Sequence, residues 1–296
     1  MTVLEVIQRS AGFLGQKGIE ESRLHAELLL AHVLKLPRMQ LYLNFERQLS
    51  AGELDCYRAL VKRRALREPL QHIVGSAWFC GLEIGVNRHV LIPRPETELL
   101  AEQGWQFLCR LAPQDAALND QAAAATSPCA LDFGTGSGCV ALALAVKCPS
   151  ATIYALDISR EALQTASGNA KKLGLNDRVR FFQGESLAAL PGDLRFDLII
   201  SNPPYIPAPE IASLQPEVRD FDPREALDGG VDGLDFYRRL AHEAPPFLKD
   251  HGRLMVEFGD GQDAAIKDLL HRQKWVVENI LEDYTHRSRL MIARKQ

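Results

Sequence analysis

The sequence predicts an α/β fold in which a doubly wound, mostly parallel sheet follows a small helical bundle. Three observations lead to this prediction. Apolar residues recur with helical spacing before residue 70, and short apolar runs alternate with helical segments after residue 129. Hydrophobic residues make up 46% of the 296 residues, enough for a sizeable core and about two domains.

The first 72 residues are expected to form the helical bundle. Between residues 21 and 34, apolar side chains follow the i, i+4, i+7 spacing of one helix face, and an earlier helix is expected near residues 3–16. Ser50 and Glu53 have the spacing of a capping box, which opens another helix. Because the connections are short, these helices should pack on one another.

The pattern changes in residues 73–92, where aromatic and β-branched residues alternate in part and Gly81 and Asn87 interrupt the run. This pattern predicts a β-hairpin that links the bundle to the next domain. PRPETELL (93–100) then begins a helix, with a proline and acidic residues at its N-terminus. The Ala-rich segment 112–130 is expected to be a solvent-exposed loop.

Residues 93–296 are predicted to be one domain built on seven strands. Strands that alternate with helices indicate parallel pairing. The last two strands are joined by only about four residues, too few for a parallel crossover, so they should pair antiparallel. The expected strands cover residues 129–133, 152–157, 179–185, 196–201, 253–259, 275–283 and 288–295.

DFGTGSG (132–138) stands between the first strand and a helix and is a candidate ligand-binding loop. Alternate glycines let the backbone approach a ligand closely, and the helix behind them offers free N–H groups. A dinucleotide fingerprint would need glycine at position 139, where Cys139 stands, so a pyrophosphate cofactor is disfavoured. The candidate cofactor contacts here are Gly134, Thr135, Gly136, Ser137 and Gly138.

Acidic residues close the next two strands. Asp157 ends the second strand, where a carboxylate can accept hydrogen bonds from ribose hydroxyls. Glu185 ends the third strand, where an adenine would lie, and Ser186 follows it. SNPPYI (201–206) follows the fourth strand. Because ligands bind at the carboxyl ends of parallel strands, all these residues should share one ligand-binding edge.

These motifs together resemble those of the S-adenosylmethionine-dependent methyltransferases: GxGxG after the first strand, an acid after the second and NPPY after the fourth. More narrowly, the chain resembles the PrmC/HemK family, N5-glutamine methyltransferases that act on peptide-chain release factors. IPRPETE (92–98) is the most discriminating segment. The resemblance also covers residues 68–100, 132–145, 196–207 and 224–240, with Phe133 and Ser186 as small departures.

The resemblance implies a Rossmann-like class I methyltransferase sheet, S-adenosyl-L-methionine as cofactor and class I release factors as protein substrates. The methyl acceptor would be the glutamine of a Gly-Gly-Gln loop. The implied catalytic residues are Asn202, Pro203 and Tyr205, and the same three with Pro204 would bind the substrate. Asn202 would also contact the cofactor. The helical bundle is expected to dock the body of the substrate.

An amide nitrogen is a poor nucleophile because its lone pair is delocalised. Acceptors that grip its two N–H groups would turn the lone pair toward the methyl group. The Asn202 side-chain oxygen and the Pro203 carbonyl can serve as these acceptors, because the prolines hold the segment rigid. Asparagine, unlike aspartate, places no bare charge against a neutral amide. Tyr205 can narrow the slot, and no strong general base is required.

The composition excludes several other classes of protein. A net charge of −4 and a pI near 6.1 disfavour nucleic acid as the main partner. No apolar run has the length of a membrane span, and the six scattered cysteines form no CxxC pair. We therefore expect a cytoplasmic monomer with no metal, no membrane contact and no direct nucleic-acid contact.

Three alternatives stay open at this point. One is an amino-methyltransferase for a nucleobase of DNA or ribosomal RNA, since an NPPY motif can also bind the exocyclic amines of bases. A second is a methyltransferase for a ribosomal-protein glutamine. The third is a scaffold that binds the cofactor without turnover.

Overall fold

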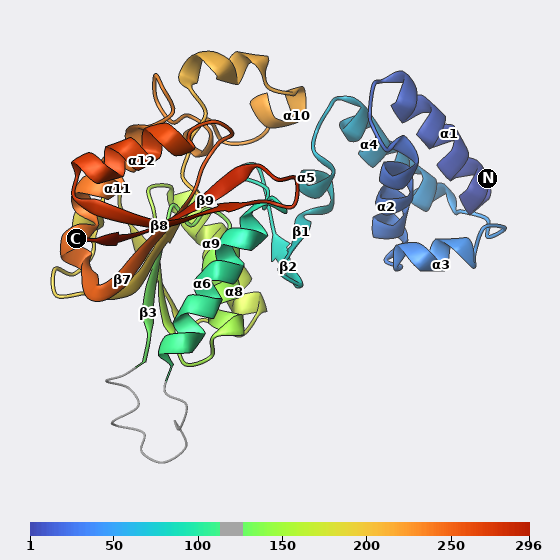
Figure 1. The fold of residues 1–296 in the computed structure, drawn as a ribbon. Helices are drawn as coiled ribbons and strands as arrows, with labels where there is room; N and C mark the ends of the chain where they lie inside the picture. The colour runs from blue at the N-terminus through green and yellow to red at the C-terminus, as the bar shows by residue number, and fades with distance from the viewer. Residues whose placement is uncertain (113–126) are drawn as a thin grey trace. The chain divides into compact units, whose positions relative to one another are not determined.

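The computed structural model describes residues 1–112 and 127–296, which divide into two compact units. One unit is Met1–Ser76 with Gln215–Phe221, and the other is Ala77–Leu214 with Asp222–Gln296. The ribbon is shown in Figure 1. Most of the loop expected at 112–130 lies outside the described residues. Within the described ranges, no helix is both long enough and apolar enough to cross a membrane.

The N-terminal unit is the predicted helical bundle. Both of its longest helices start with capping boxes, Thr2 with Glu5 and the predicted Ser50 with Glu53. The two short helices at residues 38–42 and 70–74 are not apparent in the apolar pattern, because each has a single turn. The bundle helices are α1 (Val3–Gln16), α2 (Ser22–Leu34), α3 (Arg38–Tyr42), α4 (Ala51–Ala65) and α5 (Leu70–Val74).

A distant piece of chain, Gln215–Phe221 with helix α10 (Pro216–Arg219), belongs to the bundle unit. Glu217 holds it there through Arg64 Nη2 at 2.9 Å and Arg67 Nε at 2.9 Å. Burial opposes the charge on Glu217, but hydrogen bonds from the two arginines lower its pKa overall. Nothing in the apolar periodicity of the sequence predicts this long-range anchor.

The predicted hairpin is present but shorter than residues 73–92. Its strands are β1 (Ser76–Phe79) and β2 (Leu82–Gly85). Cys80 and Gly81 both have positive φ, 50° and 79°, as a tight two-residue hairpin turn requires. An irregular segment then leads to helix α6 (Thr97–Leu111), whose first turn includes Glu98.

The second unit contains the predicted seven-stranded sheet, in the order β5-β4-β3-β6-β7-β9-β8. The first five strands are parallel, and β9 is antiparallel to both β7 and β8, as expected for the last pair. The strands are β3 (Cys129–Phe133), β4 (Thr152–Asp157), β5 (Val179–Gln183), β6 (Phe196–Ser201), β7 (Leu248–Glu257), β8 (Trp275–Glu282) and β9 (Ser288–Lys295).

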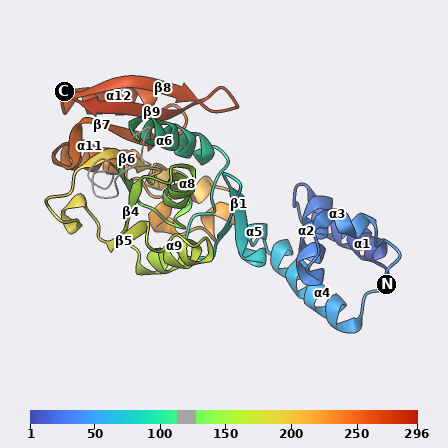
Figure 2. The same ribbon diagram turned by 90° about the horizontal axis from the view of Figure 1, so that it is seen from below.

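Helices cover both faces of this sheet (Figures 1 and 2). Helices α6, α8 (Cys139–Lys147) and α9 (Arg160–Lys172) pack on one face, and α11 (Asp235–Glu243) and α12 (Asp263–Arg272) pack on the other. A hydrophobic core lies on each face of the sheet, and strand β6 contributes to both. Leu198 and Ile200 belong to one core and Ile199 to the other. Short 3₁₀ turns cover Leu187–Ala189, Ala208–Ser213, Arg224–Ala226 and Pro245–Phe247.

Candidate active site

Hydrogen bonds draw the ends of three central strands together. The Ser201 hydroxyl, at the end of β6, donates to the Phe133 carbonyl at the end of β3 (2.6 Å). The amides of Gly134 and Thr135 donate to the Leu156 carbonyl near the end of β4, at 2.8 and 3.1 Å. The glycine loop and the NPPY segment are therefore side by side at the carboxyl edge of the sheet, as the sequence predicts.

The glycine loop needs its three glycines for their backbone conformation. Gly134, Gly136 and Gly138 have φ of 76°, 55° and 82°, a region that strains other residues. Gly138 caps α8, and a Cβ there would come within 3.0 Å of Ala166. Gly138 thus serves packing between α8 and α9 and does not line the cavity described below.

Asp132 braces this loop from inside. It is 1% exposed and accepts hydrogen bonds from Thr135 Oγ1 at 2.7 Å and from the Ala141 amide at 3.1 Å. Burial raises its pKa to about 7, although both hydrogen bonds favour the charged form. Asp132 also lines the cavity, so it is a site residue that the sequence reasoning quoted but did not select.

Asp157 closes β4 and holds the glycine loop against the start of α9. Its carboxylate accepts the Gly136 amide at 2.8 Å and the Ser159 amide at 2.9 Å. Each oxygen keeps a further lone pair for a ligand. Burial raises the pKa of Asp157, opposed by these backbone hydrogen bonds.

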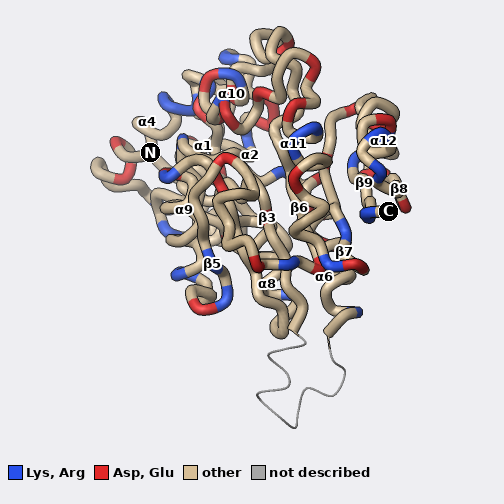
Figure 3. Tube along the Cα trace, turned by 90° about the vertical axis from the view of Figure 1, so that its left-hand side faces the viewer, with Lys and Arg blue, Asp and Glu red and all other residues tan. Residues whose placement is uncertain are grey.

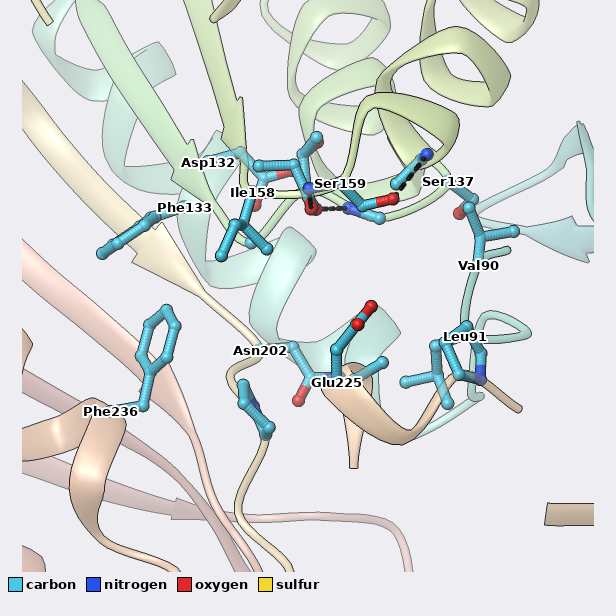
Figure 4. A pocket seen from close by; sticks show the side chains of 18 of the residues that line it. Val90, Leu91, Asp132, Phe133, Ser137, Ile158, Ser159, Asn202, Glu225 and Phe236 are labelled. Carbon is cyan, nitrogen blue, oxygen red and sulfur yellow. Dashed lines mark hydrogen bonds between the residues drawn. The ribbon is translucent and has the colours of Figure 1, made fainter. Parts of the chain in front are cut away.

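A cavity of about 590 Å³ lies in front of these strand ends. Figure 4 shows Asp132, Ser137 and Ser159 on one side and Asn202 and Glu225 on the other. Its volume falls within the range of small-molecule sites. The sequence-selected residues that line it are Gly134, Thr135, Gly136, Ser137, Asp157, Glu185, Asn202 and Pro204, whereas Gly138, Ser186, Pro203 and Tyr205 are not among its lining residues.

One end of the cavity has apolar walls. The Phe133 and Phe236 rings lie 4.8 Å apart between centroids, and Ile158 is 53% exposed although it is apolar. The Glu185 carboxylate accepts a hydrogen bond from Arg239 at 3.0 Å, so it is paired within the protein. Apolar faces beside polar groups suit a flat nitrogen heterocycle.

The NPPY segment contains two acceptors, the Asn202 side-chain oxygen and the Pro203 carbonyl, and Asn202 lines the cavity. Asn202 Nδ2 donates to Thr97 Oγ1 at 3.0 Å, which leaves Asn202 Oδ1 on the other side of the amide. Among the described residues, no donor is hydrogen-bonded to Asn202 Oδ1 or to the Pro203 carbonyl. Pro203 itself is buried.

Glycines of the 226–233 loop pack behind this clamp. A Cβ on Gly233 would come within 2.4 Å of the Tyr205 carbonyl, and one on Gly229 within 2.9 Å of the Pro204 carbonyl. The Tyr205 carbonyl accepts a hydrogen bond from Gln262 Nε2 at 2.9 Å, and the Tyr205 ring packs against the apolar core. Burial raises the pKa of the Tyr205 hydroxyl to about 12, so it stays neutral.

Several site residues escaped selection from the sequence. Glu257 ends strand β7 as Asp157 ends β4, and it is buried behind the cavity rather than among the residues that line it. Thr97 lies within the IPRPETE segment, but its contact with Asn202 spans 105 residues and has no local signal. The remaining unselected residues with side chains at the cavity include Arg94, Asp132, Ile158, Glu225, Phe236 and Arg239.

The cavity fits a cationic nucleoside cofactor. The Ser137 hydroxyl is buried and has no hydrogen-bond partner within the described chain. Six carboxyl groups and three arginines line the same space, and this net acidic lining favours a positive centre such as a sulfonium. The carboxyl groups are those of Asp132, Asp157, Glu185, Glu225, Asp228 and Asp235, and the arginines are Arg94, Arg224 and Arg239. No cluster of three metal-binding side chains occurs in residues 1–112 and 127–296.

The sequence matches two known families, the PrmC N-terminal domain over residues 5–75 and a methyltransferase domain over residues 129–289. A release factor glutamine methyltransferase of Geobacter sulfurreducens is 45% identical over 92% of this chain and 89% of its own length. The chain belongs to the release factor glutamine methyltransferase family. A member from Chlorobaculum tepidum is 41% identical over 96% of this chain and 94% of its own length.

Solved structures of more distant methyltransferases share the fold of this family member. The human methyltransferase 10 domain containing protein superposes with a TM-score of 0.51 at 17% identity, over 81% of this chain and 97% of its own. The hMettl16 catalytic domain, solved with an RNA hairpin, gives 0.54 at 18% identity over 80% of each chain. These likenesses confirm the predicted class I methyltransferase fold.

Proposed function

We propose that this enzyme transfers a methyl group from S-adenosyl-L-methionine to the side-chain amide nitrogen of the glutamine in a release-factor Gly-Gly-Gln loop. The observation that carries the proposal is the pair of acceptors without an internal donor, Asn202 Oδ1 and the Pro203 carbonyl. A primary amide has two N–H groups, so two acceptors held on one rigid segment match it. Because translation takes place in the cytoplasm, we place the enzyme there.

The clamp acts by orientation. With both N–H groups of the substrate amide engaged, its nitrogen lone pair faces the cavity. Such positioning can contribute several kcal/mol to the rate, up to about 7–11 in the best intramolecular reactions. Asn202 is neutral and therefore does not bury a charge against the substrate. Tyr205 is neutral too, and we assign it to the wall of the substrate slot.

The cofactor would supply an activated methyl group, and the chain would supply its site. We assign the Ser137 amide and hydroxyl to its polar tail, because the amides of Gly134, Thr135, Gly136 and Gly138 already donate within the protein. Asp157 would accept the ribose hydroxyls with its remaining lone pairs. Ile158 and Phe236 would cover the adenine ring, and Glu185 would border it.

The helical bundle would dock the body of the release factor. Residues 1–76 carry eleven Lys and Arg against eight Asp and Glu, whereas the rest of the chain carries 23 against 30. The most exposed large apolar side chains of the bundle are Met39 at 68%, Leu43 at 85% and Leu66 at 76%. Apolar residues on a mildly basic surface are suited to a protein partner.

The direct test is mass spectrometry of purified release factors after incubation with the enzyme and cofactor. One added methyl group on the Gly-Gly-Gln glutamine is expected, and none with the Asn202→Ala enzyme. Ribosomal RNA, DNA and ribosomal proteins serve as competing substrates. Methylation of one of these, with no methylation of the release factor, would reject the proposal.

A further inference from the structure

The clamp requires one particular orientation of the Asn202 amide. Oxygen and nitrogen of a carboxamide have nearly the same shape, so hydrogen bonds decide which of them faces the substrate. If Nδ2 faced the cavity, Asn202 would present a hydrogen-bond donor to the N–H groups of the substrate amide, which need an acceptor. Some feature of the protein must therefore hold the amide with Oδ1 facing the substrate.

Thr97 contacts the nitrogen side of this amide. It is the first residue of α6, is 2% exposed, and its Oγ1 lies 3.0 Å from Asn202 Nδ2. A hydroxyl has one hydrogen and can either donate it or accept with its lone pairs. If Thr97 gave that hydrogen to Asn202, the amide would turn over. The direction of the contact depends on where the Thr97 hydrogen goes.

Glu257 supplies the competing acceptor. It ends β7, next to the strand that carries Asn202, and is 2% exposed. Hydrogen bonding by the Thr97 side chain favours the charged form of Glu257 and lowers its pKa. Its Oε2 has no hydrogen-bond partner, and no ion pair in residues 1–112 and 127–296 involves it. The nearby Arg289 is already paired with Asp283 at 3.1 Å and with the Phe258 carbonyl at 3.2 Å.

We propose that Glu257 and Thr97 are positioning residues that fix the Asn202 amide for catalysis, through a directed chain of hydrogen bonds from Asn202 Nδ2 to Thr97 and from Thr97 to Glu257. The ionised carboxylate accepts the single Thr97 hydrogen. The Thr97 lone pairs then accept from Asn202, and Oδ1 faces the substrate. This inference rests on the proposed amide substrate and adds how the enzyme orients its clamp.

The arrangement is sensitive to the charge on Glu257. A protonated carboxyl group can donate to Thr97, which frees the Thr97 hydrogen to point at Asn202. Burial raises the pKa of Glu257 to about 7, against the effects of Thr97 and the positive charges. The charged and titratable groups that face it are Arg289 on β9, Arg94 and Glu96 before α6, Tyr205 after β6 and Tyr237 on α11.

The first test compares Thr97→Val with Thr97→Ser. Valine keeps the shape of threonine but has no hydroxyl, and serine keeps the hydroxyl. We expect kcat for release-factor methylation to fall about tenfold to a hundredfold in Thr97→Val and to recover most of that loss in Thr97→Ser. Cofactor affinity, measured by calorimetry, should stay within about threefold of wild type in both. Equal kcat in the two variants would overturn the proposal.

The second test uses the pH profile of single-turnover methylation. Wild-type rate should fall as pH drops through about 7, the pKa of Glu257. Glu257→Gln should be slower at all pH values and should lack this dependence. Asp197→Asn, at the opposite edge of the sheet, is the matched control and should keep the wild-type profile. A Glu257→Gln enzyme with wild-type rate and profile would overturn the proposal.

These outcomes are separable from failure of the proposed function. If wild-type enzyme does not methylate release factor at all, the substrate assignment fails. If it does, and Thr97→Val matches Thr97→Ser, only the positioning role fails. Thermal melting and cofactor binding check that each variant is folded. The methylation rate of a variant that binds cofactor normally can then be compared with that of the wild type.

Discussion

Two buried carboxyl groups at opposite edges of the central sheet, Asp197 and Glu257, are paired to different extents. Figure 3 marks the acidic and basic residues along the chain trace. At the amino edge, Asp197 accepts hydrogen bonds from Lys249 at 2.7 Å and the Cys129 amide at 2.7 Å, and lies 2.6 Å from His251. At the carboxyl edge, Glu257 keeps an oxygen without a partner.

The pKa values follow this difference. Burial opposes the charge at both edges, but the partners of Asp197 hold its pKa below the usual range. At the carboxyl edge burial prevails, and the pKa values of Asp132 and Glu257 rise to about 7. Fully paired charges stabilise a fold, whereas incompletely paired ones remain available for a ligand or a proton.

The largest expected effect is at the clamp. Asn202→Ala removes an acceptor for the substrate amide, so turnover should fall by about a thousandfold. Cofactor affinity should change by less than about threefold, because the glycine loop and Asp157 are untouched. Separate measurements of calorimetric affinity and methyl incorporation check this. Wild-type turnover would remove Asn202 from the catalytic role.

A pair of substitutions compares the two edges directly. Asp157→Asn should weaken cofactor binding about tenfold to a hundredfold, because a neutral amide keeps only one acceptor oxygen. Asp197→Asn should leave that affinity unchanged but lower the free energy of unfolding by about 1–3 kcal/mol, because Lys249 loses its charged partner. Calorimetry and urea unfolding give the two values. Equal cofactor affinities would contradict the division between the edges.

The last contrast is in the pH dependence of stability, which should have opposite signs for Asp197 and Asp132. The pKa of Asp197 is lowered by folding, so its contribution is present above pH 4 and is lost as pH falls through its folded pKa. The pKa of Asp132 is raised to about 7, so unfolding free energy should decline as pH rises from about 4 to 7.

Urea unfolding between pH 3 and 8 tests these signs. Asp132→Asn should flatten the decline toward pH 7 by up to about 1.4 kcal/mol per pH unit, and Asp197→Asn should flatten the loss below pH 4. If both substitutions changed the same limb of the profile, the contrast between the edges would be wrong.

Local pattern predicted most strands and the glycine loop, because strand periodicity and positive φ act within a few residues. It did not predict α12, which contributes only Ile266 and Leu270 to the core as fully buried residues. It also did not place β9 between β7 and β8, since register and order depend on contacts across the sheet. The anchor of Glu217 on Arg64 likewise joins residues 153 apart.

The sequence by itself determined the order of strands and helices along the chain, the glycine loop, the acid at the end of β4 and the NPPY segment. Each depends on residue type and spacing over short stretches. Only the tertiary structure decided which distant residues surround the clamp. Strands β6 and β7 are neighbours and α6 packs over them, which brings Thr97 and Glu257 to Asn202. Packing of elements far apart in the sequence creates that contact, so no local pattern can contain it.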